Sequence, residues 1–513
     1  MRWGWIDPRN WFAATAVRRG YVGARQDRRT AGWVAGGDSA NAEVGRDAPM
    51  LRQRARDLAR NSPYGKSVVD KLAAYLLGRD GITPRAATGI EELDRILDDA
   101  WRVWARQCHA NGRLHFTGLQ RQAVRGMVMS GETYTRSRPR ASDSGRRPLA
   151  APVRLEVLEA DLCDLSLTSA LPGQPQIVQG VELGDDGAPV AYHFFRNHPG
   201  ETGIGMLRLG TPYGTIRVPA DTVAHLFDAI DRPGAVHGVS YLHAIIQLLK
   251  DFEGFQDAIR VGNRARACLM AWITGGQHSF PDDPSVPDGF EPALDNDGKV
   301  LEGFRPGGVA HLSAGKEVKF NDPTPAGNYE QHVTTELHGA GAGVNLPYAV
   351  LTGDIRKANF ANIRFGMESF ETWLAAVRRD LIIPLWCQPV WGWFIDALIV
   401  AGEISETYRG ADGRPIDLYG AASWQLPART SVDRYKDVLA DVMEIRGGIA
   451  SRTDAIRRRG RDPDEVLAEI VRERERDEFL GLVFDSDAAA TTSAGVAQAD
   501  VADAIVEADS DAA

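Results

Sequence analysis

The sequence predicts a multidomain α+β protein, and three observations carry this prediction. The chain has 513 residues, enough for about two to four domains. Apolar residues recur at helical spacing over long stretches, the longest being 239–273. Between residues 153 and 227, apolar and polar residues alternate, with Gly and Pro between the runs. That pattern indicates a mostly antiparallel sheet.

The charge of the chain is unevenly distributed. The net charge is −10, yet residues 1–60 hold twelve Arg against six Asp and Glu. Residues 481–513 hold seven acids and no Lys or Arg. The remaining body is mildly acidic and lacks the basic patch of a tight nucleic-acid binder. It suits a surface that DNA slides past, and equally an ordinary soluble protein.

The cysteines and the N-terminus indicate a reducing compartment. No C-x-x-C pair occurs, which argues against zinc and against a disulfide framework. The first ten residues lack an apolar signal core, so we do not expect secretion. The four cysteines are Cys108, Cys163, Cys268 and Cys387.

The first part of the chain predicts an arm followed by helices. Residues 1–50 are basic and rich in Gly and Ala, and we expect an extended arm. Helical structure begins within 51–60, and Ser62 with Pro63 forms a good N-cap and first position for the next helix. A second helix is predicted over 90–108. A third opens at Thr117, with Gln120 in capping-box spacing.

The GKS at 65–67 is no phosphate-binding loop, because Arg60 stands where that motif needs glycine and a helix replaces the strand. Alternating strands follow the third helix and complete an α+β body. Their predicted ranges are Val153–Glu159, Gln176–Leu183, Pro189–Phe195 and Thr222–Phe227.

Residues 239–273 predict a helix of roughly 50 Å, which Ser240 can cap. Its exposed surface alternates in charge, as a solvated face does. After it, 275–327 is rich in Pro and Gly, with short strands expected near 299–304 and 317–320. A weaker helix returns over 328–337. The charged residues singled out on the long helix are Lys250, Glu253, Asp257, Arg260 and Arg264.

Residues 346–361 predict a loop that leads into a long amphipathic helix. The helix has one apolar stripe from Ile363 to Leu381, and Pro384 ends or kinks it. A loop with these cations could meet a polyanion, or it could be an ordinary solvated loop. Its candidate contact residues, with two at the start of the helix, are Arg356, Lys357, Asn359, Asn362 and Arg364.

The apolar run 381–402 is long enough to span a membrane. It contains two prolines and Asp396, and an aspartate at that depth costs about 3 kcal/mol. We therefore predict a buried helical hairpin and no membrane association. Trp424 marks a strand or a tucked segment. Three helices are expected over 432–446, 453–459 and 464–479, the last capped by Asp462, and a disordered acidic tail follows from about residue 485.

Catalytic motifs are lacking. His193 and His198 lack the helical spacing of metal ligands, and no H-E-x-x-H occurs. Asp161 and Asp164 could form a carboxylate pair, although near a strand end such residues more often form turns. We expect no catalytic residue, no metal site and no cofactor.

Several motifs in a defined order point to one family. TGDIRKANFANIR at 352–364 precedes the long helix, and upstream stand RARDLARNSPYGKSVVDKL, VLEADLCD and DRPGAVHGVSYL. Downstream come the segment around Trp424 and GIASRTDAIRRRGRDPDEVLAEI. Together they closely resemble the portal proteins of tailed bacteriophages, lambda-type family, over roughly 51–487.

The resemblance implies a portal fold, an α+β assembly whose named parts we use below. The wing is mixed α/β, the stem consists of long helices, the clip is a small α/β unit and the crown is helical. The implied ranges are 1–50 basic N-terminal arm, 51–237 wing, 238–273 stem helix, 274–327 clip, 328–344 second stem helix, 345–361 tunnel loop, 362–430 long helix and wing return, 431–484 crown, and 485–513 acidic disordered tail.

The resemblance also implies a function without catalysis. Portal proteins form a ring, implied here to be a dodecamer, at one capsid vertex, where double-stranded DNA passes without sequence readout during packaging and ejection. The tunnel-loop residues named above would touch phosphates, and the stem charges would face a neighbour or the channel. The implied partners are the terminase large subunit, the major capsid protein and a head–tail adaptor. The protein would reside in the virion after assembly in the host cytoplasm.

Two alternatives stay open from the residues alone. One is a minor capsid or scaffold component without a channel, which the symmetry of the oligomer would distinguish. The other is a metal-dependent nuclease using Asp161 and Asp164, which magnesium-dependent DNA cleavage would reveal.

Overall fold

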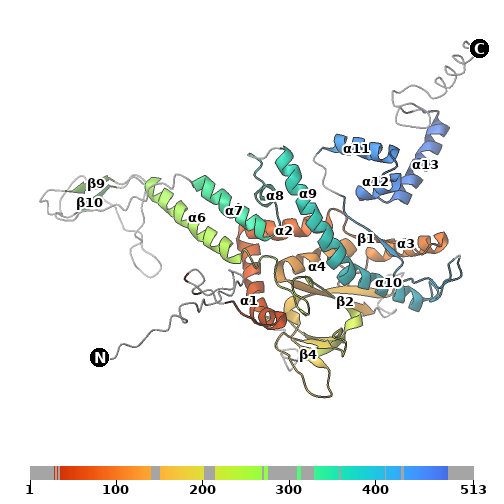
Figure 1. The fold of residues 1–513 in the computed structure, drawn as a ribbon, viewed down its shortest axis with the longest axis horizontal. Coiled ribbons are helices and arrows are strands. Elements are labelled where there is room, and N and C mark those ends of the chain that lie inside the picture. The colour runs from red at the N-terminus through yellow and green to blue at the C-terminus, as the bar shows by residue number, and fades with distance from the viewer. Residues whose placement is uncertain are drawn as a thin grey trace, which may run out of the picture.

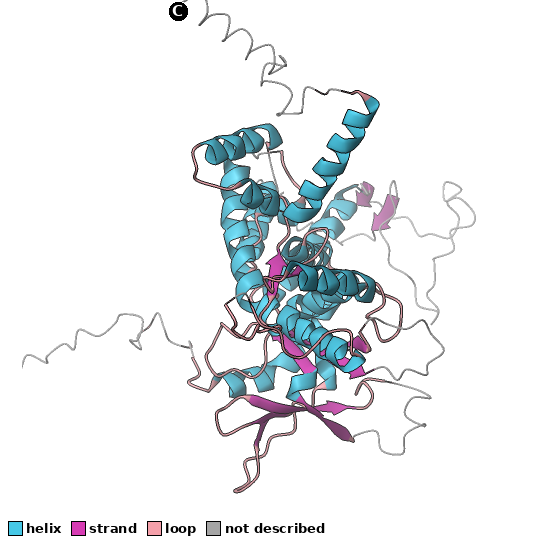
Figure 2. Cartoon of the chain, turned by 90° about the vertical axis from the view of Figure 1, so that its right-hand side faces the viewer, coloured by secondary structure: helices cyan, strands magenta, loops and turns pink. Residues whose placement is uncertain are grey.

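The computed structural model describes most of the chain: residues 28, 32, 35–139, 151–201, 214–267, 271–274, 309–312, 329–356, 360–410, 412–428, 433–482 and 484. The crown helices lie at one end of the molecule and the four-stranded sheet of the wing at the other, in both views (Figures 1 and 2). From the side of the body, α6 and α7 project together, with β9 and β10 at their far end (Figure 1).

The first helix begins earlier than predicted. Helix α1 spans Ala40–Asn61, and its N-cap Ser39 accepts a hydrogen bond from the Ala42 N–H at 3.3 Å. The prediction of an extended arm over 1–50 is therefore wrong for residues 40–50. Small residues such as Ala48 and Ala55 form the buried face of α1, so the Ala-rich composition marked a packed helix there.

The predicted N-cap of the second helix is confirmed, and that of the fourth helix is wrong. Helix α2 is Pro63–Leu77, with the Ser62 side chain capping it as predicted. Helix α3 is Glu91–Ala105 and α4 is Phe116–Ser130. The cap of α4 is the His115 ring, so Thr117 is not the N-cap. Gln120 is buried instead, where its amide bonds both the N–H and the carbonyl of Ile82 at 2.9 and 3.1 Å.

The described residues between 132 and 227 form two antiparallel sheets. Strand β2 (Glu132–Pro139) lies between β3 (Val153–Glu159) and β8 (Val223–Phe227). The second sheet runs β4 (Gln176–Val178), β5 (Val181–Leu183), β6 (Pro189–Phe195) and β7 (Thr215–Pro219). The antiparallel prediction is confirmed, but β2 and β7 were not predicted. Short 3₁₀ turns at Ala160–Leu162 and Ala220–Thr222 lead into or out of these strands.

The predicted strand 176–183 is in fact a tight hairpin. Gln179 and Gly180 both have positive φ, 53° and 81°. Two adjacent positive φ values form a type I′ turn, whose twist suits a two-residue hairpin. The side-chain amide of Gln179 donates to the Asn41 carbonyl, which ties this turn to α1.

Helix α6 spans Ile246–Ala267, shorter than the predicted 239–273. Ser240 explains the later start, because its hydroxyl accepts from the Leu242 N–H and donates to the Val128 carbonyl. That bond ties the segment before α6 to α4 rather than to a longer helix. Helix α7 spans Tyr329–Gly343, and β9 (Ala271–Thr274) pairs in parallel with β10 (Val309–Leu312). The strands predicted near 299–304 and 317–320 lie outside the described residues.

A single continuous helical run replaces the predicted hairpin after the loop. Helix α9 (Phe360–Val377) continues through the π-helical segment η5 (Arg378–Cys387) into α10 (Gln388–Ala401). Pro384 lies inside η5. A proline removes one N–H and clashes with the carbonyl four residues back, and the wider π turn relieves both problems without ending the helix.

Among the described residues, one helix, Asn362–Ala401, is long and apolar enough to cross a membrane, and 56% of its most apolar window is buried in the fold. Much of that burial is aromatic. The Trp386 indole N–H donates to the Thr135 hydroxyl at 2.8 Å, and that of Trp391 donates to the Leu418 carbonyl at 3.0 Å. The run thus forms the centre of the large hydrophobic core.

The crown is three helices: α11 (Arg434–Arg446), α12 (Arg452–Arg458) and α13 (Pro463–Leu480). Asp462 caps α13 as predicted. Strand β11 (Ala422–Gln425), the strand marked by Trp424, pairs with β1 (Thr83–Ala86). Arg85 in β1 makes ion pairs with Asp462 and Glu465, which anchor the base of α13 on the body.

Candidate DNA-channel surface

The tunnel loop begins with a short helix fastened to the body. Helix α8 (Tyr348–Thr352) lies within the predicted loop, so that segment is only partly irregular. The carbonyl of Leu351 accepts from the Ser67 hydroxyl at 2.7 Å and from the Lys71 ammonium at 3.3 Å. Leu351 itself is buried in the core. These bonds fix the start of the loop on α2.

The ring of Tyr348 orders the segment that follows α8. It stacks on His338 of α7 with centroids 4.3 Å apart, and its hydroxyl donates to Asp354 Oδ2 at 3.4 Å. The Thr352 hydroxyl accepts the Asp354 N–H at 3.0 Å. The position of Asp354 is therefore fixed by hydrogen bonds to its side chain and to its backbone N–H.

Asp354 in turn holds Arg356 in a bidentate ion pair. The distances are 2.9 Å from Nε to Oδ1 and 2.8 Å from Nη2 to Oδ2, and the Arg356 N–H also donates to Oδ1 at 3.0 Å. These hydrogen bonds hold the pKa of the Asp354 carboxyl well below its usual range. The Arg356 side chain is 75% exposed. It faces solvent with its charge already balanced inside the chain.

Arg364, like Arg356, makes an ion pair with a nearby acid. It lies in the first turns of α9 and pairs with Glu368, one turn on, at 3.1 Å. Asn362 lies in the same first turn. Lys357 and Asn359 lie outside the described residues. The structure thus places Arg356 after α8 and Arg364 in the second turn of α9, and each makes an ion pair with an acid of the same chain.

The five singled-out charges of α6 share one stripe of the helix. They succeed one another at intervals of three and four residues, the spacing of one helical face. Lys250 pairs with Glu253 at 3.4 Å, and Arg260 donates to the Gln256 side chain at 3.2 Å. Three cations and two acids leave this stripe close to neutral: Lys250, Glu253, Asp257, Arg260 and Arg264.

The proposed carboxylate pair does not form a joint site. Asp161 makes an ion pair with Arg56, whereas Asp164 accepts from the Ser166 N–H and hydroxyl at 3.0 and 2.6 Å, capping a turn. Burial alone would raise the pKa of Asp161, but the hydrogen bond and charge of Arg56 outweigh it and lower that pKa.

Two other groups in the described part of the chain bring metal-binding side chains together. One is Glu159, Asp161 and His198, where Arg56 makes ion pairs with both acids. The other is Glu132, His225 and His237, all buried in the wing.

The buried group around Glu132 is a hydrogen-bond network. Glu132 Oε2 lies 3.0 Å from His225 Nε2 and 2.9 Å from His237 Nδ1, while Oε1 pairs with Arg52. Two ligands of one tetrahedral zinc ion lie about 3.3 Å apart, so these shorter distances are those of hydrogen bonds. Burial would raise the pKa of Glu132, but His237, Arg52 and His225 together hold it well below its usual range.

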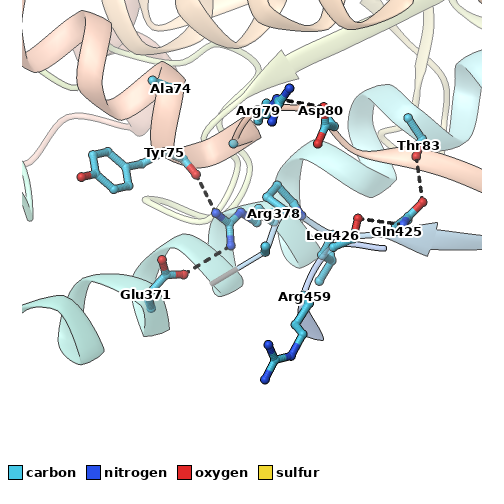
Figure 3. Close-up of a pocket in the computed structure, with 15 residues that line it drawn as sticks. Ala74, Tyr75, Arg79, Asp80, Thr83, Glu371, Arg378, Gln425, Leu426 and Arg459 are labelled. Carbon is cyan, nitrogen blue, oxygen red and sulfur yellow. Dashed lines mark hydrogen bonds and ion pairs between the residues drawn. The ribbon is translucent and has the colours of Figure 1, made fainter. Parts of the chain in front are cut away.

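A cavity of about 600 Å³ opens where α2, the long helix, β11 and the crown meet (Figure 3). Its deepest cation, Arg378, donates to the carbonyls of Tyr75 and Leu76 at 2.6 and 2.9 Å and pairs with Glu371 at 3.5 Å. Burial lowers the pKa of Arg378 against the opposing effect of Glu371. The other two arginines that line the cavity, Arg79 and Arg459, pair with Asp80 and Asp441, so all three are paired within the chain.

Sequence reasoning missed the acids that balance the loop cations, although their spacing was visible. Asp354 precedes Arg356 by two residues, and Glu368 follows Arg364 by four, the usual spacing of a helical ion pair. Arg52 and Glu132, by contrast, meet across 80 residues of chain, and no local pattern signals that contact.

Comparisons with known proteins place the chain in a family. Its residues 26–378 match the family model described as "Phage portal protein, lambda family". It is 26% identical over 485 residues to the "Probable portal protein" of Halomonas phage phiHAP-1, covering 91% of this chain and 88% of that protein. It is 23% identical over 502 residues to the "Portal protein" of Escherichia phage N15, covering 91% of each.

Solved structures with a similar chain come from gene transfer agent particles. The neck of the native particle, computed with C12 symmetry, is 16% identical, with 82% of this chain and 94% of that chain covered and a TM-score of 0.40. The virion of the native particle gives 15% identity, 85% and 98% coverage and a TM-score of 0.39. The family model spans well over half of the sequence, and the chain therefore belongs to the lambda family of phage portal proteins.

Proposed function

We propose that copies of this chain form a ring at one vertex of a phage capsid. Double-stranded DNA would pass through its channel during packaging and again during ejection. Family membership supports this role, together with one structural observation: the described cations of the tunnel loop are paired within the chain. The ring is proposed to be a dodecamer in the virion.

The balanced charges suit a moving polyanion. A surface that neutralises many phosphates releases counterions and binds DNA tightly. Here Asp354 balances Arg356 and Glu368 balances Arg364, so each copy offers phosphates contact with little net attraction. Contact with phosphates and sugars carries no sequence information, which fits a channel for any genome.

The work of the channel would be steric and electrostatic, without catalysis. We assign ATP hydrolysis to a separate terminase large subunit, which would dock on the clip, as would a head–tail adaptor later. The wing would contact the major capsid protein. The arginine-paired carboxylates described above support a protein that binds no catalytic metal.

Imaging the purified full-length protein end-on by negative-stain electron microscopy tests this function. We expect closed rings with a central hole wide enough for duplex DNA. A preparation that stays monomeric under assembly conditions, or an oligomer without a hole, contradicts the proposal.

The loop cations can then be tested in a packaging reaction. Replacing Arg356 and Lys357 by Ala should change packaging yield or DNA retention while rings still form. Arg414→Ala is the matched control, because Arg414 also pairs with an aspartate two residues earlier, at 3.6 Å, on an unrelated exposed turn. Unchanged packaging in the loop variant would remove the role of these two residues.

A further inference from the structure

The crown of a single chain has almost no hydrophobic core. Helix α11 has no buried residue, and α12 and α13 bury only Ala455 and Pro463. Yet the crown is rich in large apolar side chains: Tyr435 is 78% exposed, Ile449 81% and Phe479 89%. A unit of about 50 residues needs buried apolar surface to offset its ordering entropy. The missing core must come from another surface.

The exposed apolar residues form two stripes. On each helix they recur at intervals of one, three and four residues, which places them on one face. The α11 stripe is Tyr435, Val438, Leu439, Val442 and Met443, and the α13 stripe is Leu467, Ile470 and Val471. Figure 1 shows α11 and α13 on opposite sides of the crown, and in Figure 2 the helix leading to the C-terminal trace stands clear of the others.

The segments of the crown also differ in charge. Residues 434–461, with α11 and α12, carry eight Lys and Arg against four Asp and Glu. Helix α13, Pro463–Leu480, carries three Arg against seven Asp and Glu. The segment 434–461 is therefore net positive and α13 net negative, although α11 by itself carries three Lys and Arg against three Asp and Glu, and Arg461 pairs with Glu469 of α13. The α11 and α13 helices each have an apolar stripe. Identical copies placed head to tail would bring opposite charges and two apolar stripes together.

We propose that the α11 stripe of one copy packs against the α13 stripe of the next, so that the crown gains its core only between subunits. This inference rests on the ring proposed above and names the surface that joins its crowns. Because the contact joins different faces, it repeats around a closed ring instead of stopping at a dimer.

Paired cysteines test this contact directly. Assembled full-length Met443→Cys/Ile470→Cys protein, treated with a short bismaleimide linker, should yield a ladder of covalent species beyond the dimer on a denaturing gel. Leu439→Cys/Val471→Cys samples a second register of the same contact. Met443→Cys alone should give no ladder, and unmodified protein controls for the native cysteines. Leu171→Cys/Ile470→Cys, with an equally exposed wing residue, is the matched negative control.

Each outcome decides between the two proposals. Rings that form without a ladder in either register overturn the crown contact and leave the portal function standing. Covalent dimers from Met443→Cys alone would show that α11 packs against α11, and linkage only within one chain would show that the crown closes on itself; both overturn the proposal. Failure of the unmodified protein to form rings would instead count against the proposed function.

Discussion

At the scale of single residues, Asp354 balances the charge that Arg356 presents to solvent. Its carboxylate takes both the backbone and the guanidinium hydrogen bonds of Arg356. Arg356, which is predicted to touch phosphates, is therefore exposed, but its charge is balanced by Asp354. The electrostatic potential at this point depends on the pair and not on Arg356 alone.

Asp354→Asn should release that cation. We expect the assembled ring to bind short duplex DNA more tightly at low salt, with a steeper loss of affinity as salt rises, because each copy offers one more phosphate contact. Fluorescence anisotropy over a salt series measures both effects. Asp412→Asn, which breaks the corresponding pair with Arg414, is the control, and an equal gain in both variants would contradict a loop-specific effect.

Glu132 carries a second residue-scale prediction, because it balances the buried Arg52. Glu132→Gln leaves that cation without a charged partner, and removing one member of a buried pair costs about 3–5 kcal/mol. Urea unfolding at pH 7 measures the loss. Arg52→Met/Glu132→Leu removes both charges and should destabilise the protein less than Glu132→Gln does. If the double variant is as unstable as Glu132→Gln, the loss does not come from an unpaired buried charge.

The same pair predicts a dependence on pH. The folded pKa of Glu132 lies well below its ordinary value of 4.5. A lowered carboxyl pKa adds stability above the unfolded pKa, and this is lost as pH falls through the folded pKa. The stability gap between wild type and Glu132→Gln should stay constant above about pH 5 and narrow below it.

At the scale of elements, glycines decide how α7 meets the loop. A Cβ on Gly341 would lie 2.6 Å from the Leu346 carbonyl oxygen, because the chain turns back on itself there. A Cβ on Gly339 would meet only the Leu248 side chain, at an ordinary 3.6 Å. Gly339, Gly341 and Gly343 all lie within α7, where Gly341 permits a close backbone approach.

Gly341→Ala should therefore destabilise the protein by roughly 1–3 kcal/mol through overpacking. Gly339→Ala, two residues earlier on the same helix, should be neutral or stabilising by up to about 1 kcal/mol. Thermal unfolding of both variants checks the pair. Equal effects would mean that helix propensity, and not the turn onto Leu346, sets the requirement for glycine.

At the scale of the whole molecule, the described residues form two hydrophobic cores of unequal size. The large one gathers α1 to α4, the long helix and the wing return, while a small one lies around Tyr134 and the four-stranded sheet. Cys108 belongs to the first and Cys163 to the second. Burial raises the pKa of both thiols to about 12, so neither is a thiolate near pH 8 unless the fold opens.

Thiol labelling should separate the opening of the two cores. Under iodoacetamide pulses in rising urea, Cys163 should react at lower urea than Cys108, because the smaller core buries less apolar surface. Mass spectrometry of the labelled peptides measures each site, and Cys387 should follow Cys108. Simultaneous labelling of Cys163 and Cys108 would mean that the two cores unfold as one unit.

Local signals determined much of this protein from the sequence alone. Ser62–Pro63 and Asp462–Pro463 start their helices as predicted, because a cap involves atoms only a few residues apart. The antiparallel strands followed from their alternation, and the order of motifs pointed to the portal family. The DNA contacts expected of Arg356 and Arg364 stay predictions, and Lys357 and Asn359 lie outside the described residues.

Tertiary structure alone decided the rest. The long helix runs past Pro384 because aromatic side chains such as Trp386 bury it on the wing, a contact made across 251 residues. Gln120 does not form the predicted capping box but hydrogen-bonds the backbone of Ile82. Arg52 pairs with Glu132, which lies 80 residues away in the sequence. Such pairings depend on which distant surfaces pack together, and the free energy of that packing is absent from any local stretch of sequence.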